Sequence, residues 1–341
     1  MAYRRELLNG WVTPAELEGY MYSKIAGTGS YLPEKILTNA DLEKLVDTSD
    51  EWIRTRTGIT QRHIASEGET TTDLAERAAR RAMDAAGVTA ADIDLICVGT
   101  TTPDLVFPNV GTLVQERLGI RGCPAFSLEA ACTGFVYALS VADKFVRLGE
   151  AKCALVIGAE TLTRILDWND RATCVLFADG AGAVILTPSS EPGIISTRLH
   201  SDGKYKDLLM YPDGVSKGFK LVREGKAGVQ MKGNEVYKVA VNTLGQLVTE
   251  TLTANGIGKD QLDWLIPHQA NIRIIEAIAK RLDLPMERVI VTIGDQGNTS
   301  AASVPLALDT GIRDGRVQRG QLLLLEAFGG GFTWGSALIR Y

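Results

Sequence analysis

The sequence lacks CxxC pairs, and its five cysteines are scattered over 341 residues at positions 97, 123, 132, 153 and 174. The missing pairs argue against a zinc ribbon and against a thioredoxin-like redox site. An odd number of cysteines in a long chain is typical of a reducing compartment, where disulfides rarely persist. We therefore predict that the protein holds no metal ion.

Long apolar runs are also missing. A membrane helix needs about 18 consecutive apolar residues, and no segment approaches that length. The pair Arg4-Arg5 is not followed by the apolar segment of a signal peptide. A net charge of −5 gives no electrostatic reason to expect nucleic acid or an anionic membrane as the main partner. We therefore expect a cytoplasmic protein with neither of these partners.

The glycine pattern does not support a dinucleotide cofactor. Gly27-Thr28-Gly29 lacks the third glycine of the dinucleotide fingerprint, and Tyr31-Leu32-Pro33 follows it. A second cluster, Gly329-Gly330-Gly331, follows an apolar strand. Its backbone could offer an N–H group to a developing oxyanion, or it could simply form a tight loop.

What the sequence does contain is an internal repeat. Each half carries, in the same order, segments that resemble helix ends, short loops and strands. The matching segments are 85–96 with 254–265, 117–120 with 281–284, 147–158 with 313–325, and 181–186 with 335–339. The offset stays near 166 residues for the first three matches, as between residues 147 and 313, and is 154 for the last. Four matches in order indicate a duplicated α/β unit.

The strands of both halves are continuous apolar runs, such as 155–157 and 322–325. Such runs are typical of strands that helices cover on both faces. We therefore predict one α/β body with the layers α/β/α/β/α. The halves 21–190 and 191–341 are predicted to meet where Pro188 and Pro192 interrupt the pattern.

Cys132 differs from the other cysteines in its setting. It lies between the small-residue turn Glu129-Ala130-Ala131 and a helix-like segment that begins near Phe135. The free amides and the dipole of a helix start favour the thiolate, which is the reactive form of cysteine. The same context fits a cysteine packed at a strand-to-helix corner, and the local sequence leaves both interpretations open.

His268 and Asn298 are the candidate partners of Cys132. His268 directly follows a buried strand, and Asn298 lies in a turn before a small-residue helix. Each also has a structural interpretation, as a histidine at a strand end or as an ordinary turn or N-cap residue. In the repeat, however, Cys132 and Asn298 are predicted to occupy corresponding positions, each on the loop after the second repeated strand and before a small-residue helix. Two-fold packing of the halves would bring these loops and the His268 loop together.

Six motifs occur in order along the chain: DTSDEWI at 47–53, RTGI at 56–59, ACTGF at 131–135, PHQAN at 267–271, GNTSAAS at 297–303 and EAFGGG at 326–331. With them, the chain from about Met21 to Tyr341 resembles β-ketoacyl-acyl-carrier-protein synthase III, of the thiolase-like superfamily. The resemblance implies the thiolase-like fold, in which duplicated half-domains form five layers. Residues 1–20 precede the usual start of the family and are predicted to be a dispensable extension.

The resemblance implies an acyltransferase that initiates fatty-acid synthesis in two half-reactions. Cys132 would accept an acyl group, by default acetyl, from acyl-CoA. His268 and Asn298 would then hydrogen-bond the thioester oxygen of malonyl-acyl-carrier protein while carbon dioxide leaves. Backbone N–H groups of Cys132 and Gly330 would hold the oxyanion. No cofactor would be needed, because the coenzyme A thioester is a substrate.

The resemblance also implies residues that bind coenzyme A. Trp52 and Arg171 would flank the adenine, Arg56 would bind phosphate, and Asn234 and Asn271 would contact the pantetheine. Guanidinium groups suit both tasks, because they stack on planar rings and bind phosphate through forked donors. Without the resemblance, any one of these arginines is better explained as a solvated surface charge.

Two macromolecular partners follow from the same resemblance. The carrier protein is acidic, so Arg273, Lys280 and Arg281 on the helix after His268 are the candidate docking residues. The same helix could be an ordinary amphipathic one. Phe107 resembles the residue that closes the acyl pocket from the neighbouring subunit, and a homodimer is therefore expected.

Other functions stay open at this point. Relatives with the same three residues make polyketide or alkylquinolone precursors, or join two long acyl chains. A papain-type hydrolase shares the chain order but needs a Cys-Gly-Ser-Cys-Trp motif that is absent here, and a non-catalytic acyl-CoA-binding scaffold is a third class. The sequence does not predict the acyl chain, because pocket depth depends on side chains around Phe107, Leu162, Leu166 and 201–220.

Overall fold

Two β-sheets form the frame of the computed structural model, which describes residues 22–341. The predicted extension 1–20 lies outside the described residues. The first sheet has the order β1 (Tyr22–Tyr31), β7 (Asp179–Ser189), β6 (Ala154–Thr161), β4 (Leu95–Gly99) and β5 (Ala125–Leu128). The second has the order β8 (Ile194–Ser201), β13 (Thr333–Arg340), β12 (Leu322–Gly329) and β11 (Trp264–Pro267).

The two sheets repeat one topology. In the first, β7 is antiparallel to β1 and β6, whereas β6, β4 and β5 are parallel. In the second, β13 is antiparallel to β8 and β12, and β12 is parallel to β11. A parallel bridge between Leu265 and Val289 stands where the first sheet has β5. This correspondence agrees with the repeat in the sequence. Residues 190–193 connect β7 to β8, and the division of the chain at residue 190 stays a prediction.

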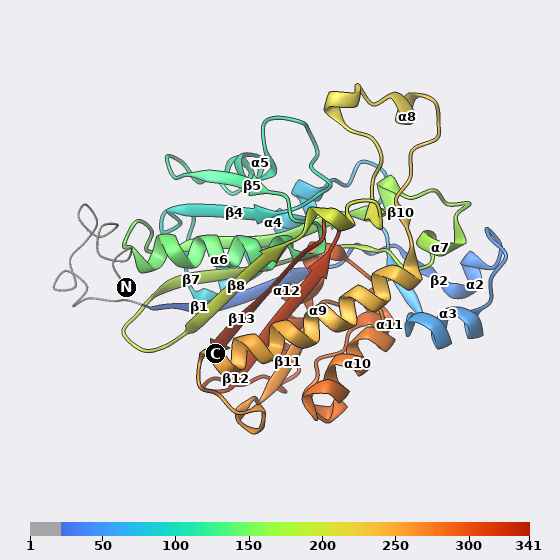
Figure 1. Ribbon diagram of the computed structural model, residues 1–341. Coiled ribbons are helices and arrows are strands. Elements are labelled where there is room, and N and C mark those ends of the chain that lie inside the picture. The colour runs from blue at the N-terminus through green and yellow to red at the C-terminus, as the bar shows by residue number, and fades with distance from the viewer. Residues whose placement is uncertain (1–21) are drawn as a thin grey trace, which may run out of the picture.

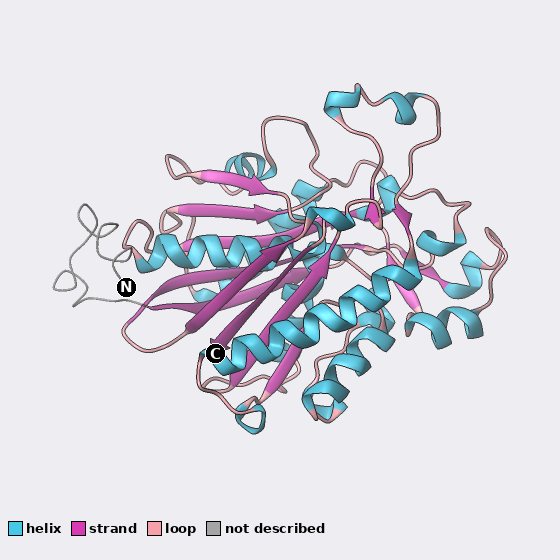
Figure 2. Cartoon of the chain, viewed as in Figure 1, coloured by secondary structure: helices cyan, strands magenta, loops and turns pink. Residues whose placement is uncertain are grey.

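Helices cover both outer faces and fill the space between the sheets (Figure 2). Helices α4 (Thr71–Ala86) and α5 (Val110–Arg117) pack on the outer face of the first sheet. Helices α6 (Gly134–Arg147) and α12 (Ser303–Arg313) lie between the sheets. Helices α9 (Gly233–Ala254) and α10 (Ile272–Leu282) cover the second sheet from outside. These layers confirm the predicted α/β/α/β/α body.

The apolar strands show why the layers form. Along β12, Leu323 and Leu325 belong to the core between the sheets, whereas Leu322 and Leu324 belong to the core beneath α9 and α10. All four leucines are buried. Successive strand residues point to opposite faces, so a strand that is apolar on both faces must be covered twice.

Shorter elements complete the fold, and most of them lie near the ends of the strands. They are β2 (Ile36–Thr38), α2 (Asn39–Leu42), α3 (Asp50–Thr57), β3 (Gln61–His63), α7 (Arg171–Cys174), β9 (Leu209–Met210), α8 (Lys220–Arg223), β10 (Gln230–Met231) and α11 (Ile293–Gln296). Helix α8 lies on a loop that projects away from the sheets (Figure 1). Within residues 22–341, no helix has both the length and the apolar character needed to cross a membrane.

Candidate active site

Two equivalent turns meet between the sheets. Turn η1 (Ala131–Thr133) leads into α6, and turn η7 (Ser300–Ala302) leads into α12. Each turn begins at a non-glycine residue in the left-handed region, with φ of +46° at Ala131 and +50° at Ser300. The turns are 169 residues apart (300 minus 131). The loops correspond as predicted, but the counterpart of Cys132 is Ala301 rather than Asn298, which lies three positions earlier.

Cys132 lies against the end of β12. A side-chain carbon added at Gly329 would lie 2.6 Å from the Cys132 backbone nitrogen, so only glycine allows this approach. The backbone N–H groups of Cys132 and Gly330 both hydrogen-bond the sulfur, and the Ser300 hydroxyl lies 3.5 Å from it. The site thus surrounds the sulfur with donors suited to negative charge.

The protonation state of Cys132 differs from the sequence expectation. Burial raises the pKa of the Cys132 thiol to about 11, while the hydrogen bonds from Ser300 and the two amides act in the opposite direction. The group is therefore a thiol at neutral pH in the unliganded protein. The donors that the sequence led us to expect are therefore present, but the loss of hydration outweighs their effect on the pKa of the free thiol.

Hydrogen bonds hold both the backbone and the imidazole ring of His268. Its backbone N–H donates to the Glu326 carbonyl (2.8 Å), which extends the β11–β12 pairing. Its Nδ1 lies 2.5 Å from Ser303 Oγ, and that oxygen also accepts the Gln269 backbone N–H (3.4 Å). The Ser303 hydroxyl can donate to Nδ1, and we assign this tautomer, in which the proton of the neutral ring is on Nε2. Burial lowers the pKa of His268 to about 3, so the ring is neutral at pH 7.

Asn298 is fixed by its own loop. Its backbone pairs with Leu176 and Ala178 (3.0 and 2.9 Å), which ties it to the first half of the chain. Its side-chain Oδ1 accepts the backbone N–H of Ser300 (3.0 Å). With the oxygen engaged, the Nδ2 group is the part of the amide that can donate to a ligand.

Two cavities meet at Cys132. The smaller, of about 340 Å³, is lined by Cys132, His268 and Asn298 together. The larger, of about 1060 Å³, is lined by Cys132, Ser300 and Gly330 and by a mixture of apolar and polar side chains. A nucleophile at such a junction can accept a group from one cavity and hold it in the other.

The predicted coenzyme A residues gather at the smaller cavity. Trp52, Arg56, Asn234 and Asn271 line it, whereas Arg171 does not. The Arg171 guanidinium instead stacks on the Trp52 ring, 5.0 Å from its centroid. Asn271 also has a structural task, because its Oδ1 accepts the Arg273 backbone N–H and its Nδ2 donates to the Arg56 carbonyl.

The predicted docking residues Arg273, Lys280 and Arg281 are all exposed on α10. Arg273 also borders the smaller cavity, and its guanidinium lies 5.3 Å from the Tyr237 ring centroid. Phe107 is 83% exposed and lines neither cavity within this chain. Of the residues expected to set pocket depth, Leu162 and residues 206, 209–211, 213–215 and 219 line the larger cavity, whereas Leu166 does not.

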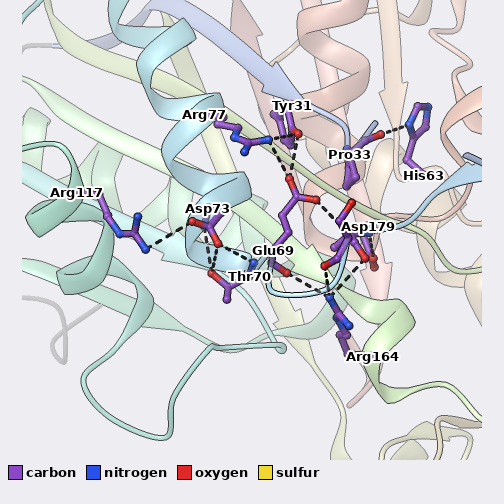
Figure 3. Close-up of polar contacts among 12 residues, drawn as sticks. Tyr31, Pro33, His63, Glu69, Thr70, Asp73, Arg77, Arg117, Arg164 and Asp179 are labelled. Atoms are coloured by element: carbon purple, nitrogen blue, oxygen red, sulfur yellow. Dashed lines mark hydrogen bonds and ion pairs between the residues drawn. The ribbon is translucent and has the colours of Figure 1, made fainter. Parts of the chain in front are cut away.

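A polar network holds the loop that borders the larger cavity before α4 (Figure 3). The Glu69 carboxylate accepts hydrogen bonds from Tyr31 (3.0 Å) and Arg77 (2.9 Å). Arg164 donates to the Ser66 carbonyl (2.6 Å), and the buried Asp179 accepts the backbone N–H of residue 65 (2.8 Å). These hydrogen bonds connect the rim of the cavity to β1, α4 and the turn after β6.

Three polar residues of the site were not predicted from the sequence. They are Ser300, Ser303 and Glu160, a fully buried carboxylate at the end of β6. Glu160 is the only charged residue in its apolar strand, and that signal could have marked it. Among residues 22–341, no group of three or more His, Cys, Asp or Glu side chains could hold a metal ion.

Comparisons with known proteins agree on one family. Models described as 3-oxoacyl-acyl-carrier-protein (ACP) synthase III and its C-terminal part match residues 126–203 and 252–341. The beta-ketoacyl-acyl-carrier-protein synthase III of Xanthomonas campestris pv. campestris is 68% identical over 321 residues, which cover 94% of this chain and 99% of that protein.

Solved structures extend the likeness to the fold. The 3-oxoacyl-acyl-carrier-protein synthase III of Aquifex aeolicus VF5 has a TM-score of 0.88 and 48% identity, covering 94% of this chain and all of that one. The priming beta-ketosynthase from the R1128 polyketide biosynthetic pathway has a TM-score of 0.90 and 36% identity, covering 97% and 98%.

Proposed function

This chain belongs to the β-ketoacyl-acyl-carrier-protein synthase III family, acyltransferases that initiate fatty-acid synthesis, and from this premise we propose how its residues act. The reaction transfers an acyl group from acyl-CoA to Cys132 and then condenses it with malonyl-carrier protein. One observation carries the assignment. Cys132 lies at the junction of two cavities, with His268 and Asn298 beside it in the smaller one.

Acyl transfer is the first half-reaction. The acyl-CoA thioester reaches Cys132 through the smaller cavity, and the sulfur attacks its carbonyl carbon. The oxyanion forms where the N–H groups of Cys132 and Gly330 already point toward the sulfur. Coenzyme A leaves by the way it came, and the acyl chain remains in the larger cavity.

Decarboxylation opens the second half-reaction. Malonyl-carrier protein brings its thioester into the emptied cavity, where His268 Nε2 and Asn298 Nδ2 donate to the thioester oxygen. Both groups are neutral donors fixed by the protein, through Ser303 for His268 and through the Ser300 backbone for Asn298. The enolate that forms as carbon dioxide leaves therefore develops its charge against preorganised dipoles.

Condensation completes the cycle. The carbanion attacks the Cys132 thioester, the oxyanion again lies between the two backbone N–H groups, and the Cys132 thiolate leaves. Loss of carbon dioxide makes the overall reaction effectively irreversible. The chain's own residues supply every donor that these steps require, and the coenzyme A thioester serves as substrate rather than as cofactor.

Substrate binding is proposed to use the residues around the smaller cavity. Trp52 and Arg171 flank the adenine after their direct stacking opens, and Arg56 binds phosphate. Asn234 and Asn271 contact the pantetheine. The exposed cations Arg273, Lys280 and Arg281 on α10 attract the acidic carrier protein toward the mouth of the cavity.

The protein is proposed to act in the cytoplasm as a homodimer. The exposed Phe107 supports the dimer, because its neighbours Leu105 and Val106 border the larger cavity while Phe107 itself points elsewhere. In a dimer, Phe107 of each subunit would close the acyl cavity of the other. Apolar burial of an 83% exposed aromatic side chain would favour this contact.

The proposed function is tested by supplying acetyl-CoA and malonyl-carrier protein to the full-length protein. The expected product is acetoacetyl-carrier protein, formed with one equivalent each of carbon dioxide and free coenzyme A. Release of free acetate without ketoacyl product would indicate a hydrolase, and binding without turnover would indicate a scaffold. A panel of longer and branched acyl-CoA primers then defines the preferred chain.

A further inference from the structure

Glu160 is a buried carboxylate for which the proposed reaction has no task. It accepts hydrogen bonds from three consecutive threonines: Thr100 Oγ1 (3.3 Å), Thr101 N and Oγ1 (3.1 and 2.9 Å) and Thr102 Oγ1 (2.6 Å). Burial raises the pKa of Glu160 to about 7, although these hydrogen bonds act in the opposite direction. An ionisable group with such surroundings is a candidate for proton chemistry.

Ser300 links this carboxylate to the nucleophile. The Ser300 hydroxyl oxygen lies 3.2 Å from Glu160 Oε1 and 3.5 Å from Cys132 Sγ. A hydroxyl can accept a hydrogen bond from one neighbour while it donates to the other. Thiol, hydroxyl and carboxylate therefore form a continuous chain through which a proton can move without water.

We propose that Ser300 and Glu160 form a proton relay that deprotonates Cys132 during acyl transfer and stores its proton while the acyl-enzyme exists. This inference rests on the proposed function. Ser300 contacts the reacting sulfur and is the catalytic member of the pair. Glu160 acts only through Ser300 and is a positioning residue that keeps the proton within reach.

The relay balances in both half-reactions. As the Cys132 sulfur attacks acyl-CoA, its proton moves to Ser300 Oγ and the Ser300 proton moves to Glu160. Coenzyme A leaves as the thiolate and takes a proton from solvent. In condensation the Cys132–acyl bond breaks, and the proton returns from Glu160 through Ser300 to the departing Cys132 thiolate.

Other groups near the sulfur are less suited to this task. His268 Nε2 already carries a proton in the assigned tautomer, and its Nδ1 is occupied by Ser303. The Glu129 carboxylate lines the larger cavity but accepts the Ala131 backbone N–H (3.0 Å). Within residues 22–341, Glu160 is the only carboxylate that shares a hydrogen-bonded hydroxyl with Cys132.

The chain supplies a matched control for Glu160. Glu326 lies on β12, is also fully buried, and its pKa is raised to about 8 by burial. Neither of its carboxylate oxygens has a hydrogen-bond partner among the described residues, so it has no link to Cys132. Glu160→Gln and Glu326→Gln therefore make the same chemical change in equally buried positions.

The test measures Cys132 directly in the full chain. Rapid-quench mass spectrometry gives the rate of acyl-enzyme formation from acetyl-CoA between pH 6 and 9. Peptide mapping gives the rate of Cys132 alkylation by iodoacetamide over the same range. We expect Glu160→Gln and Ser300→Ala to slow acylation about 10- to 100-fold. Ser300→Ala, which removes a donor to the sulfur, should also move the alkylation profile to higher pH. The double variant should be no slower than the slower single one, because the two residues act in series.

Two further measurements separate a relay from a structural role. Glu326→Gln should acylate within twofold of the wild-type rate. In a Cys132→Ala background, Glu160→Gln should leave malonyl decarboxylation within twofold, since the relay does not serve that step. Equal acylation rates in wild type and Ser300→Ala, or an unshifted alkylation profile, would overturn the relay, and Ser300→Ala decides if Glu160→Gln fails to fold. A wild-type protein that forms no acyl-enzyme would instead overturn the proposed function.

Discussion

Turns η1 and η7 follow the same backbone path, since each starts at a left-handed residue and leads into a helix between the sheets. Their side chains differ. In η1 the middle residue, Cys132, faces both cavities. In η7 the middle residue, Ala301, is fully buried and lines neither, while the first residue, Ser300, reaches the sulfur. The duplicated backbone provides two places at the junction, and residue type decides which becomes the nucleophile and which supports it.

Moving the thiol from one turn to the other is the most severe test of this difference. Cys132→Ala should lower condensation by about 10⁴-fold or more, because the acyl-enzyme cannot form. Adding Ala301→Cys to that variant should not restore activity, since position 301 lies against the start of α6 and faces no cavity. Condensation assays on both variants measure this. Recovery by the second thiol would show that the two turns are interchangeable.

His268 and Asn298 test the division of labour between the halves. Replacing either by alanine should slow malonyl decarboxylation by about 10²- to 10³-fold, since each removes one donor to the developing enolate. Acylation of Cys132 should fall by less than about tenfold, because the backbone N–H groups of Cys132 and Gly330 hold the oxyanion of that step. Separate assays of the two half-reactions provide the comparison. Equal losses in both would contradict the roles assigned here.

The sequence predicts those features of the fold and the site whose physical cause lies in neighbouring residues. The repeat and the continuous apolar runs predict both sheets and their five layers. A strand whose residues are apolar on both faces must be covered on both faces, and this pattern can be seen in the strand's own sequence. The pairing of Cys132 with Asn298 is three positions off, since loop lengths in the two halves differ and only the folded turns show the register. The local sequence of Cys132 favours the thiolate, but it does not show how deeply the sulfur is buried, because that burial depends on distant segments such as Gly329.

Ser303 is a second case in which a contact between residues distant in the sequence could not be predicted. Its hydroxyl meets His268 across 35 residues of sequence, and its counterpart in the first half is Gly134 (303 minus 169). Ser303→Ala should slow decarboxylation about tenfold, because the neutral imidazole then divides its proton between Nδ1 and Nε2. Acyl-enzyme formation serves as the internal control. An unchanged decarboxylation rate would mean that Ser303 does not select the tautomer.

Glu160 and Glu326 extend the comparison to stability, where the expected effect is smallest. Burial raises the pKa of Glu326 from 4.5 to about 8. The folded state therefore keeps a proton that the unfolded chain loses above about pH 4.5. The contribution of this bound proton to the stability of the folded state is fully present below about pH 4.5 and is lost as pH rises toward 8. Glu326→Gln should flatten this dependence and raise the melting temperature by about 3 °C or more at pH 8, with little change at pH 4.5.

Calorimetry of wild type and Glu326→Gln between pH 4.5 and 9 measures this effect. Glu160→Gln should flatten the curve less, since the Glu160 carboxylate has hydrogen-bond partners that offset its burial. Parallel curves for wild type and Glu326→Gln would show that Glu326 is not protonated in the folded protein.

The most direct measurement is the intact mass of the protein after exposure to acetyl-CoA, followed by peptide mapping. We expect a single acetyl group on Cys132 in wild type and in Asn298→Ala. Malonyl-carrier protein should remove that group rapidly only from wild type, with formation of the ketoacyl product. An acetyl group on another residue, or its equally rapid removal from Asn298→Ala, would contradict the account.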